Sequence, residues 1–231
     1  MARPTALLIA GGADYHNTPE HYELLAGLLA GPAGLNVTVT DDLLGQTEAS
    51  LSAYDLLVLS ATIGQPPAAP VQALFSTVRR GTPLLGLHAA PFTVRQVEGG
   101  PEAIGSMYLG AHLPYQEFTV HILDRTHPIT AGVEDFRIQD EPYRLDILGD
   151  GVQVLAAYDG RATDAEFKGE RRPAHDEAHA WRLQRPRAPL VYVKQLGAGR
   201  ICVNALGHDR AALTHPAFRR LVAQAAQWLL S

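Results

Sequence analysis

The amino-acid sequence predicts an α/β fold with a mainly parallel central sheet. Short continuous apolar runs, typical of strands buried on both faces, alternate with helical segments over residues 6–88. Strands that alternate with helices form right-handed βαβ units, and such units build a parallel sheet. The 231 residues, 46% of them apolar, are enough for one domain with a large core, so we expect a single domain over residues 1–231.

The first half of the chain shows these elements clearly. The opening strand ends at Gly11 and Gly12, and the helices end at Gly31-Pro32 and at Gly81, because glycine and proline interrupt regular structure. In order, we expect a strand at 6–10, a helix at 19–30, strands at 35–40 and 55–60, a helix at 71–80 and a strand at 83–88.

The second half is less regular. Its expected strands cover residues 117–123, 152–158, 189–195 and 200–205, and the last two are separated by a hairpin turn at 196–199. Residues 216–230 form an amphipathic terminal helix. The charged, turn-rich stretch 161–187 is expected to be a long excursion that serves as a flap or as a contact within a homo-oligomer.

The composition excludes several classes of function. The net charge is −5 and no run of Lys or Arg is long enough to suggest a nucleic-acid face, so no nucleic-acid partner is expected. No stretch is long and apolar enough to span a membrane, and the apolar segment 5–10 is too short for a signal sequence, so a cytoplasmic location is expected. The one cysteine, Cys202, lies within an apolar strand, where cysteine is usually an inert small hydrophobe.

Polar residues gather where the strands end. Ligands of open parallel sheets bind outside the carboxyl ends of the strands. The first strand leads to Gly12 and His16, the third to Gly64, the fourth to His88, and the late strand at 200–205 to His208 and Asp209. The sequence therefore predicts a cleft lined by histidines at this edge of the sheet.

His88 is the most distinctive of these residues. The segment Gly86-Leu87-His88-Ala89-Ala90 has small residues on both sides of its centre, as in a sharp strand-to-helix turn that projects the central side chain into a cleft that solvent can reach. An imidazole there can act as an acid, a base or a metal ligand. The alternative is a hydrogen-bonded structural histidine at a tight turn.

Two further segments carry candidate chemistry. His208 beside Asp209 can be a general base with its carboxylate or a metal ligand; alternatively, Asp209 caps the next helix and His208 only packs. In Asp140-Glu141-Pro142-Tyr143, the acids and the tyrosine can bind polyol hydroxyls or tune a histidine, unless the segment is a solvated turn. The pair His175 and His179 fits a charged flap better than a metal site, and we expect His112, His121 and His215 to be structural or exposed.

The order of these segments resembles the ThuA-like family, which is named for trehalose utilisation. The resemblance covers nearly the whole chain. It rests on Gly86-Leu87-His88, His127-Pro128-Ile129, Asp140-Glu141-Pro142-Tyr143, Leu206-Gly207-His208-Asp209 and Trp228. It implies a flavodoxin-like three-layer fold similar to that of class I glutamine amidotransferases.

The resemblance also bears on activity. Class I amidotransferases carry cysteine at the sharp turn, where this chain has His88. Histidine cannot form the thioester with glutamine, so the resemblance implies the fold and the cleft but no glutaminase activity. The family name implies sugar catabolism, with a keto-sugar or a disaccharide as substrate.

Together these observations predict roles for the residues of the cleft. His88 and His208 carry out acid–base chemistry or share a divalent metal such as Zn²⁺, and Asp209 and Glu141 orient them or balance their charge. His16, Tyr143, Gly12 and Gly64 line the pocket of a sugar or polyol. The alternatives are a metal-dependent hydrolase and a non-catalytic metabolite-binding protein that has kept a degenerate amidotransferase cleft.

Overall fold

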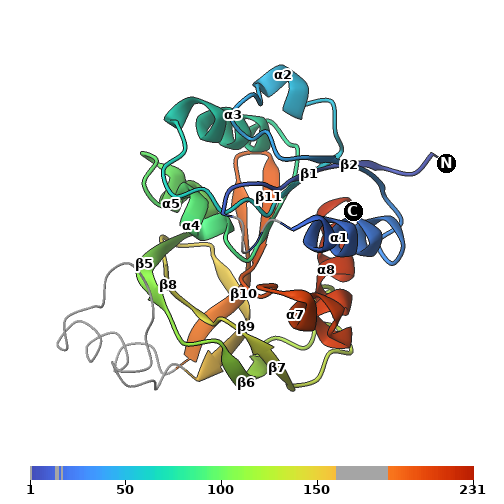
Figure 1. The fold of residues 1–231 in the computed structure, drawn as a ribbon, viewed down its shortest axis with the longest axis vertical. Helices are drawn as coiled ribbons and strands as arrows, with labels where there is room; N and C mark the ends of the chain where they lie inside the picture. The colour runs from blue at the N-terminus through green and yellow to red at the C-terminus, as the bar shows by residue number, and fades with distance from the viewer. Residues whose placement is uncertain (1, 14–15, 17, 160–186) are drawn as a thin grey trace.

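A nine-stranded sheet organises the computed structural model (Figure 1). The structure describes residues 2–13, 16, 18–159 and 187–231. The expected excursion lies outside the described residues except for Arg187, and the pair His175 and His179 lies outside them entirely.

The strand order places the middle and the end of the chain side by side. Across the sheet the strands are β2 (Asn36–Thr40), β1 (Thr5–Ile9), β3 (Leu56–Leu59), β4 (Leu84–Leu87), β11 (Gly199–Asn204), β10 (Arg187–Leu196), β9 (Gln153–Asp159), β6 (Gln116–Ile122) and β7 (Phe136–Asp140). Pairing is parallel from β2 to β11 and antiparallel from β11 to β7. The strand β11 thus joins the parallel part to the antiparallel part.

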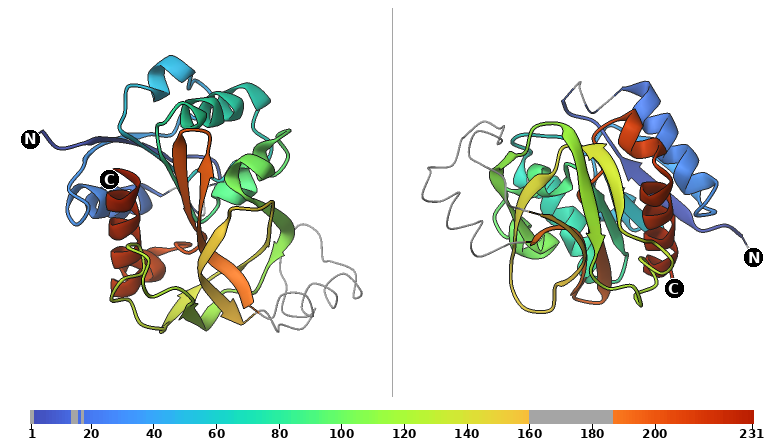
Figure 2. Two further views of the ribbon diagram at one scale, coloured as in Figure 1. Left: turned by 180° about the vertical axis from the view of Figure 1, so that it is seen from behind. Right: turned by 90° about the horizontal axis from the view of Figure 1, so that it is seen from below.

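Helices cover both faces of the parallel part. The helices α1 (Pro19–Ala30) and α8 (Pro216–Leu229) lie side by side on one face, while α3 (Ala68–Arg79), α4 (Ala90–Val94) and α5 (Gly100–Ile104) lie on the other (Figures 1 and 2). Alternate residues of β1 divide between the two cores: Leu8 packs in one cluster and Leu7 in the other. A strand buried on both faces requires a continuous apolar run, which is the pattern that predicted it. The predicted three-layer α/β fold is confirmed.

Several short elements have no counterpart in the sequence prediction. These are β5 (Ser106–His112) and β8 (Tyr143–Ile147), which form a separate antiparallel pair, β7, and the helices α2 (Glu48–Leu51), α4, α5 and α7 (Arg210–Thr214). The predicted hairpin between β10 and β11 is confirmed, and so are the longer strands and helices within a few residues at each end. In the part of the chain that the structure describes, no helix has the length and apolar character required to cross a membrane.

Candidate functional site

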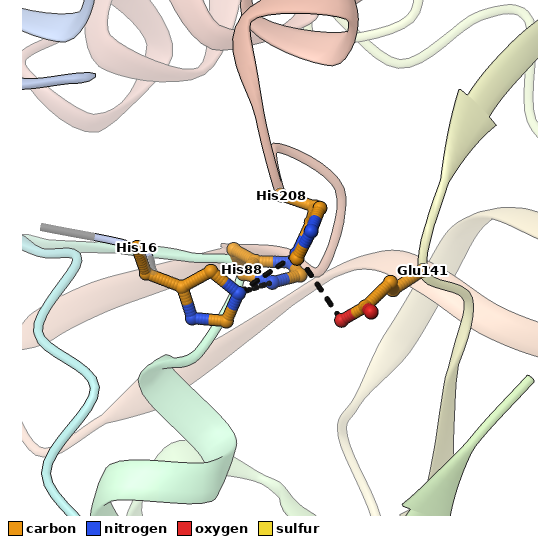
Figure 3. A group of neighbouring side chains, drawn as sticks. All are labelled: His16, His88, Glu141 and His208. Carbon is orange, nitrogen blue, oxygen red and sulfur yellow. Dashed lines mark hydrogen bonds and ion pairs between the residues drawn. The ribbon is translucent and has the colours of Figure 1, made fainter. Parts of the chain in front are cut away.

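Four side chains from distant parts of the chain converge at the carboxyl edge of the parallel strands (Figure 3). One nitrogen each of His16, His88 and His208 and one oxygen of Glu141 all lie within 4.8 Å of one another. His16 Nε2 lies 2.7 Å from His208 Nδ1 and 3.3 Å from His88 Nε2. Glu141 Oε2 lies 3.1 Å from His208 Nδ1. We call these residues the four-residue cluster.

His88 stands at the predicted sharp turn after β4. Its φ of +40° is the one positive φ of a non-glycine residue among the described positions, which marks a strained conformation. Gly86 makes the turn feasible, since a Cβ there would lie 3.1 Å from the Cβ of Ala90. The ring is only 2% exposed, so the expectation that solvent reaches it is wrong. The turn projects His88 into a buried cluster instead.

His16 reaches the cluster from the loop after β1. Gly12, with a φ of +97°, pairs with Thr62, and a Cβ on Gly12 would lie 2.0 Å from the Thr62 carbonyl oxygen. Gly12 therefore has a steric role in bringing the two loops together. Thr62 Oγ1 lies 3.0 Å from His16 Nδ1, which fixes the orientation of the imidazole ring.

Asp140, at the end of β7, holds the two remaining loops of the cluster in place. Its carboxylate is fully buried and accepts hydrogen bonds from the backbone N–H groups of Gly207 (2.7 Å), His208 (3.2 Å) and Glu141 (2.7 Å). One side chain therefore ties the loop that carries His208 to the loop that carries Glu141. The sequence prediction did not assign this residue a role of its own.

Asp209 caps the helix that follows it. Its Oδ1 accepts a hydrogen bond from Ala212 N at 3.1 Å, which makes Asp209 the N-cap of α7. Its Oδ2 accepts one from the Tyr115 hydroxyl at 2.5 Å, and the Tyr115 ring lies against His208. The alternative that Asp209 caps the next helix is therefore confirmed, while the expectation that it also orients or balances the histidines stays a prediction.

Of the other predicted residues, some lie beside the cluster and some do not. The Tyr143 hydroxyl lies 3.3 Å from His88 Nε2, beside the cluster. Gly64 lies in the loop after β3, where an added Cβ would meet nothing within 4 Å, so its predicted role in binding stays a prediction. His112 was expected to be structural or exposed, yet its Nδ1 lies 3.9 Å from Glu141 Oε2 at the rim of the cluster. His121 and His215 make structural contacts with Asp135 and Phe136, as expected.

Hydrogen bonds on the far side of two rings determine where their lone pairs point. His88 Nδ1 lies 3.3 Å from the Ala205 carbonyl oxygen, which can only accept a hydrogen bond. Nδ1 therefore carries the proton, and Nε2 is unprotonated. When His16 Nδ1 donates its hydrogen bond to Thr62 Oγ1, His16 Nε2 is likewise unprotonated. Such outer partners are typical of metal-binding histidines. Unprotonated nitrogens and a carboxylate then face one small space, which is the arrangement of a cation site.

Burial keeps two of the imidazoles neutral. It lowers the pKa of His16 to about 3 and that of His88 well below its usual range, with help from the neighbouring histidines. Burial also acts to lower the pKa of His208, but the adjacent Glu141, Asp140 and Asp209 outweigh it and raise that pKa. Neutral imidazoles are the form that binds Zn²⁺ and related ions.

His21, a further buried histidine, should make the stability of the fold sensitive to acid. Burial lowers the pKa of His21 to about 4 from 6.5, so between these pH values the unfolded chain binds a proton that the folded chain excludes. Stability present above pH 6.5 is therefore lost as the pH falls towards 4, by up to about 3 kcal/mol from this residue. Urea unfolding of a His21→Gln variant, in chelator, should show a shallower loss between pH 6.5 and 4.5 than wild type. The partly exposed His121, changed to Gln, is the control, and an unchanged pH dependence in His21→Gln would contradict the assignment.

Comparisons with known proteins agree with this fold. A family model described as ThuA, trehalose utilisation, matches residues 5–229. Among solved structures, a ThuA-like protein from Bacteroides uniformis is 16% identical with a TM-score of 0.75, covering 100% of this chain and 94% of its own. One from Parabacteroides merdae is 18% identical with a TM-score of 0.70, covering 100% and 91%.

A more distant structural neighbour is described as a subunit of a GMP synthase. This protein, from Thermoplasma acidophilum, is 12% identical with a TM-score of 0.59, covering 98% of this chain and 94% of its own. At these identities the likeness concerns the fold alone. Among curated protein sequences, none matched the chain.

Proposed function

The chain belongs to the ThuA family, and from that premise we propose that it is a cytoplasmic, metal-dependent enzyme that acts on a sugar. The family description supplies the substrate class, because trehalose is a disaccharide. The geometry of the four-residue cluster supports the metal.

The convergence of four ligand atoms is the observation that carries this proposal. Ligand bonds to Zn²⁺ are about 2.0–2.2 Å long, so two ligands of one ion are at most about 4.4 Å apart. The cluster atoms span at most 4.8 Å, so only small side-chain adjustments separate them from that arrangement. Three imidazoles and one carboxylate suit Zn²⁺ or a neighbouring first-row ion better than Mg²⁺ or Ca²⁺.

The chain's own residues then have distinct roles. His16, His88, His208 and Glu141 would hold the ion, which as a Lewis acid polarises a carbonyl or hydroxyl oxygen. The side chains of His208 and Glu141 are 19% and 17% exposed, while His16 and His88 are buried, so substrate is expected to approach from the side of His208 and Glu141. The rim residue His112 stands beside that approach, where it can exchange a proton with a sugar hydroxyl. The Tyr143 hydroxyl contacts His88 on the buried side of the cluster.

Glutamine hydrolysis is not part of the proposal. The turn carries His88 where a class I amidotransferase has its nucleophilic cysteine. The only thiol, Cys202, is fully buried within β11, and burial raises its pKa far above the range of a reactive thiolate.

Metal content tests the proposal directly. Elemental analysis of protein purified without a histidine tag should find about one divalent ion per chain. Removing it with a chelator should abolish turnover of keto-sugars or disaccharides. At a hundredfold excess over its Kd, restored Zn²⁺ should add about 2.7 kcal/mol to stability, or roughly 5–10 °C in Tm.

Two other outcomes would be decisive. Metal far below one per chain, with no rise in Tm when Zn²⁺ is added, would overturn the metal site and leave acid–base chemistry by His208 and Glu141. Bound metal without turnover of any sugar would indicate a non-catalytic binding protein instead.

A further inference from the structure

A hollow lies beside the four-residue cluster, on the other side of Tyr143. It has a volume of about 430 Å³, within the ~300–1,000 Å³ typical of small-molecule sites. Its walls include Gln65 from the loop after β3, Phe92 in α4, Arg95 and Gln96 just after that helix, and Tyr108 in β5. These segments follow the carboxyl ends of β3 and β4, the edge where parallel sheets bind ligands.

The hollow is connected to the cluster through two tyrosines. The ring centroid of Tyr108, which lines the hollow, is 5.1 Å from that of Tyr143. The Tyr143 hydroxyl in turn lies 3.3 Å from His88 Nε2. A ligand in the hollow would therefore be separated from the cluster by the thickness of this aromatic pair.

Hydrogen bonds hold two walls of the hollow together. Thr93, fully buried in α4, donates to the Ala61 carbonyl oxygen at 2.5 Å and accepts from Ile63 N at 3.0 Å. The loop that carries Gln65 is thereby tied to the helix that carries Phe92. The Arg95 guanidinium lies 3.6 Å above the Phe92 ring centroid and donates to the Phe92 carbonyl oxygen. A site with walls fixed in this way loses little entropy when a ligand binds.

The lining chemistry matches a polyhydroxylated ligand. Two primary amides offer paired donors and acceptors, as the hydroxyl groups of a sugar require, and a guanidinium adds donors. The aromatic rings of Phe92 and Tyr108 offer apolar surface for the C–H groups of a sugar ring. Among the described lining residues there is no carboxylate to attract a cationic ligand.

We propose that this hollow is a subsite that binds one ring of a neutral sugar, next to the four-residue cluster. The inference rests on the proposed function for its substrate class. It assigns part of the recognition of that substrate to the hollow, whose residues are separate from the proposed metal ligands.

The test uses trehalose, glucose and their 3-keto forms as probes. Calorimetry or saturation-transfer NMR should detect binding of at least one of them to wild type. Gln65→Ala and Gln96→Ala should each weaken that binding about tenfold, the value of one or two lost hydrogen bonds, while metal content stays at the wild-type level. Gln139→Ala, on the exposed face of β7, is the matched control and should bind as wild type does.

The outcomes separate this subsite from the metal proposal. Sugar binding that weakens in both glutamine variants supports the subsite even if the protein holds no metal. Binding that is unchanged in both variants, or absent for every probe, overturns the subsite even if the metal is present. A crystal soaked with the tightest probe should show its ring against Phe92 or Tyr108, and a ring bound elsewhere would also overturn the inference.

Discussion

A His88→Asn variant should lose bound metal and sugar turnover together. The substitution removes the Nε2 atom that faces His16, and a lost ligand should weaken metal binding by more than the 10–100-fold typical of outer-shell changes. Turnover should fall by a factor of about 10² or more, whether the ring binds metal or transfers protons. Asparagine is chosen because it tolerates positive φ better than alanine does, so the strained turn is kept.

Two measurements check this prediction. Competition against a chromogenic chelator gives the metal affinity, and circular dichroism shows whether the fold is kept. His121→Asn is the matched control, because its imidazole pairs with Asp135 on the exposed surface, away from the cluster. Wild-type metal affinity in a folded His88→Asn protein would show that His88 is not a ligand. His16, His208 and Glu141 would then remain as the candidate ligands.

An Asp140→Asn variant should be damaged in both stability and metal affinity. The amide has one acceptor oxygen where the carboxylate has two, so its NH₂ group must face a backbone N–H of Gly207, His208 or Glu141. Losing these charge-assisted bonds in a fully buried position should cost about 3 kcal/mol, or roughly 10 °C in Tm. The loops of His208 and Glu141 should then be less well placed, which should weaken metal binding by about 10–100-fold.

The stability of this variant is measured in chelator so that it does not include the effect of metal. Asp135→Asn is the control, because its carboxylate is much more exposed and its ion pairs contribute little. Reduced stability with unchanged metal affinity would show that Asp140 supports the fold without positioning the cluster.

Much of the fold could be predicted because its signals are local. A continuous apolar run such as 6–10 indicates a strand buried on both faces. Gly31 and Gly81 indicate where a helix ends. The strands β5 and β8 escaped prediction because they pair with each other outside the main sheet. The helix α4 is one turn long and contains Pro91, so it has no periodicity to detect.

The convergence of the three histidines could be predicted from the sequence, because it depends on which residues follow the strands. His16, His88 and His208 follow strands that end at one edge, and the ends of parallel strands meet there. The role of Asp140 could not be predicted, because its partners are backbone N–H groups and every residue except proline has one. Sequence alone left two roles open for Asp209, because it adjoins His208 and also precedes a helix, and the structure shows its capping bond to α7.

The position of β11 determines when the site can assemble during synthesis. It lies between β4 and β10 in the sheet, and His208 follows it late in the sequence, while His16 and His88 belong to the part translated first. A nascent chain whose β11 is still inside the ribosome can pair β1, β3 and β4 but lacks the strand that brings His208 to His16. The cluster is therefore completed only after β11 has emerged, and any metal that it holds with all four ligands must be acquired after that point.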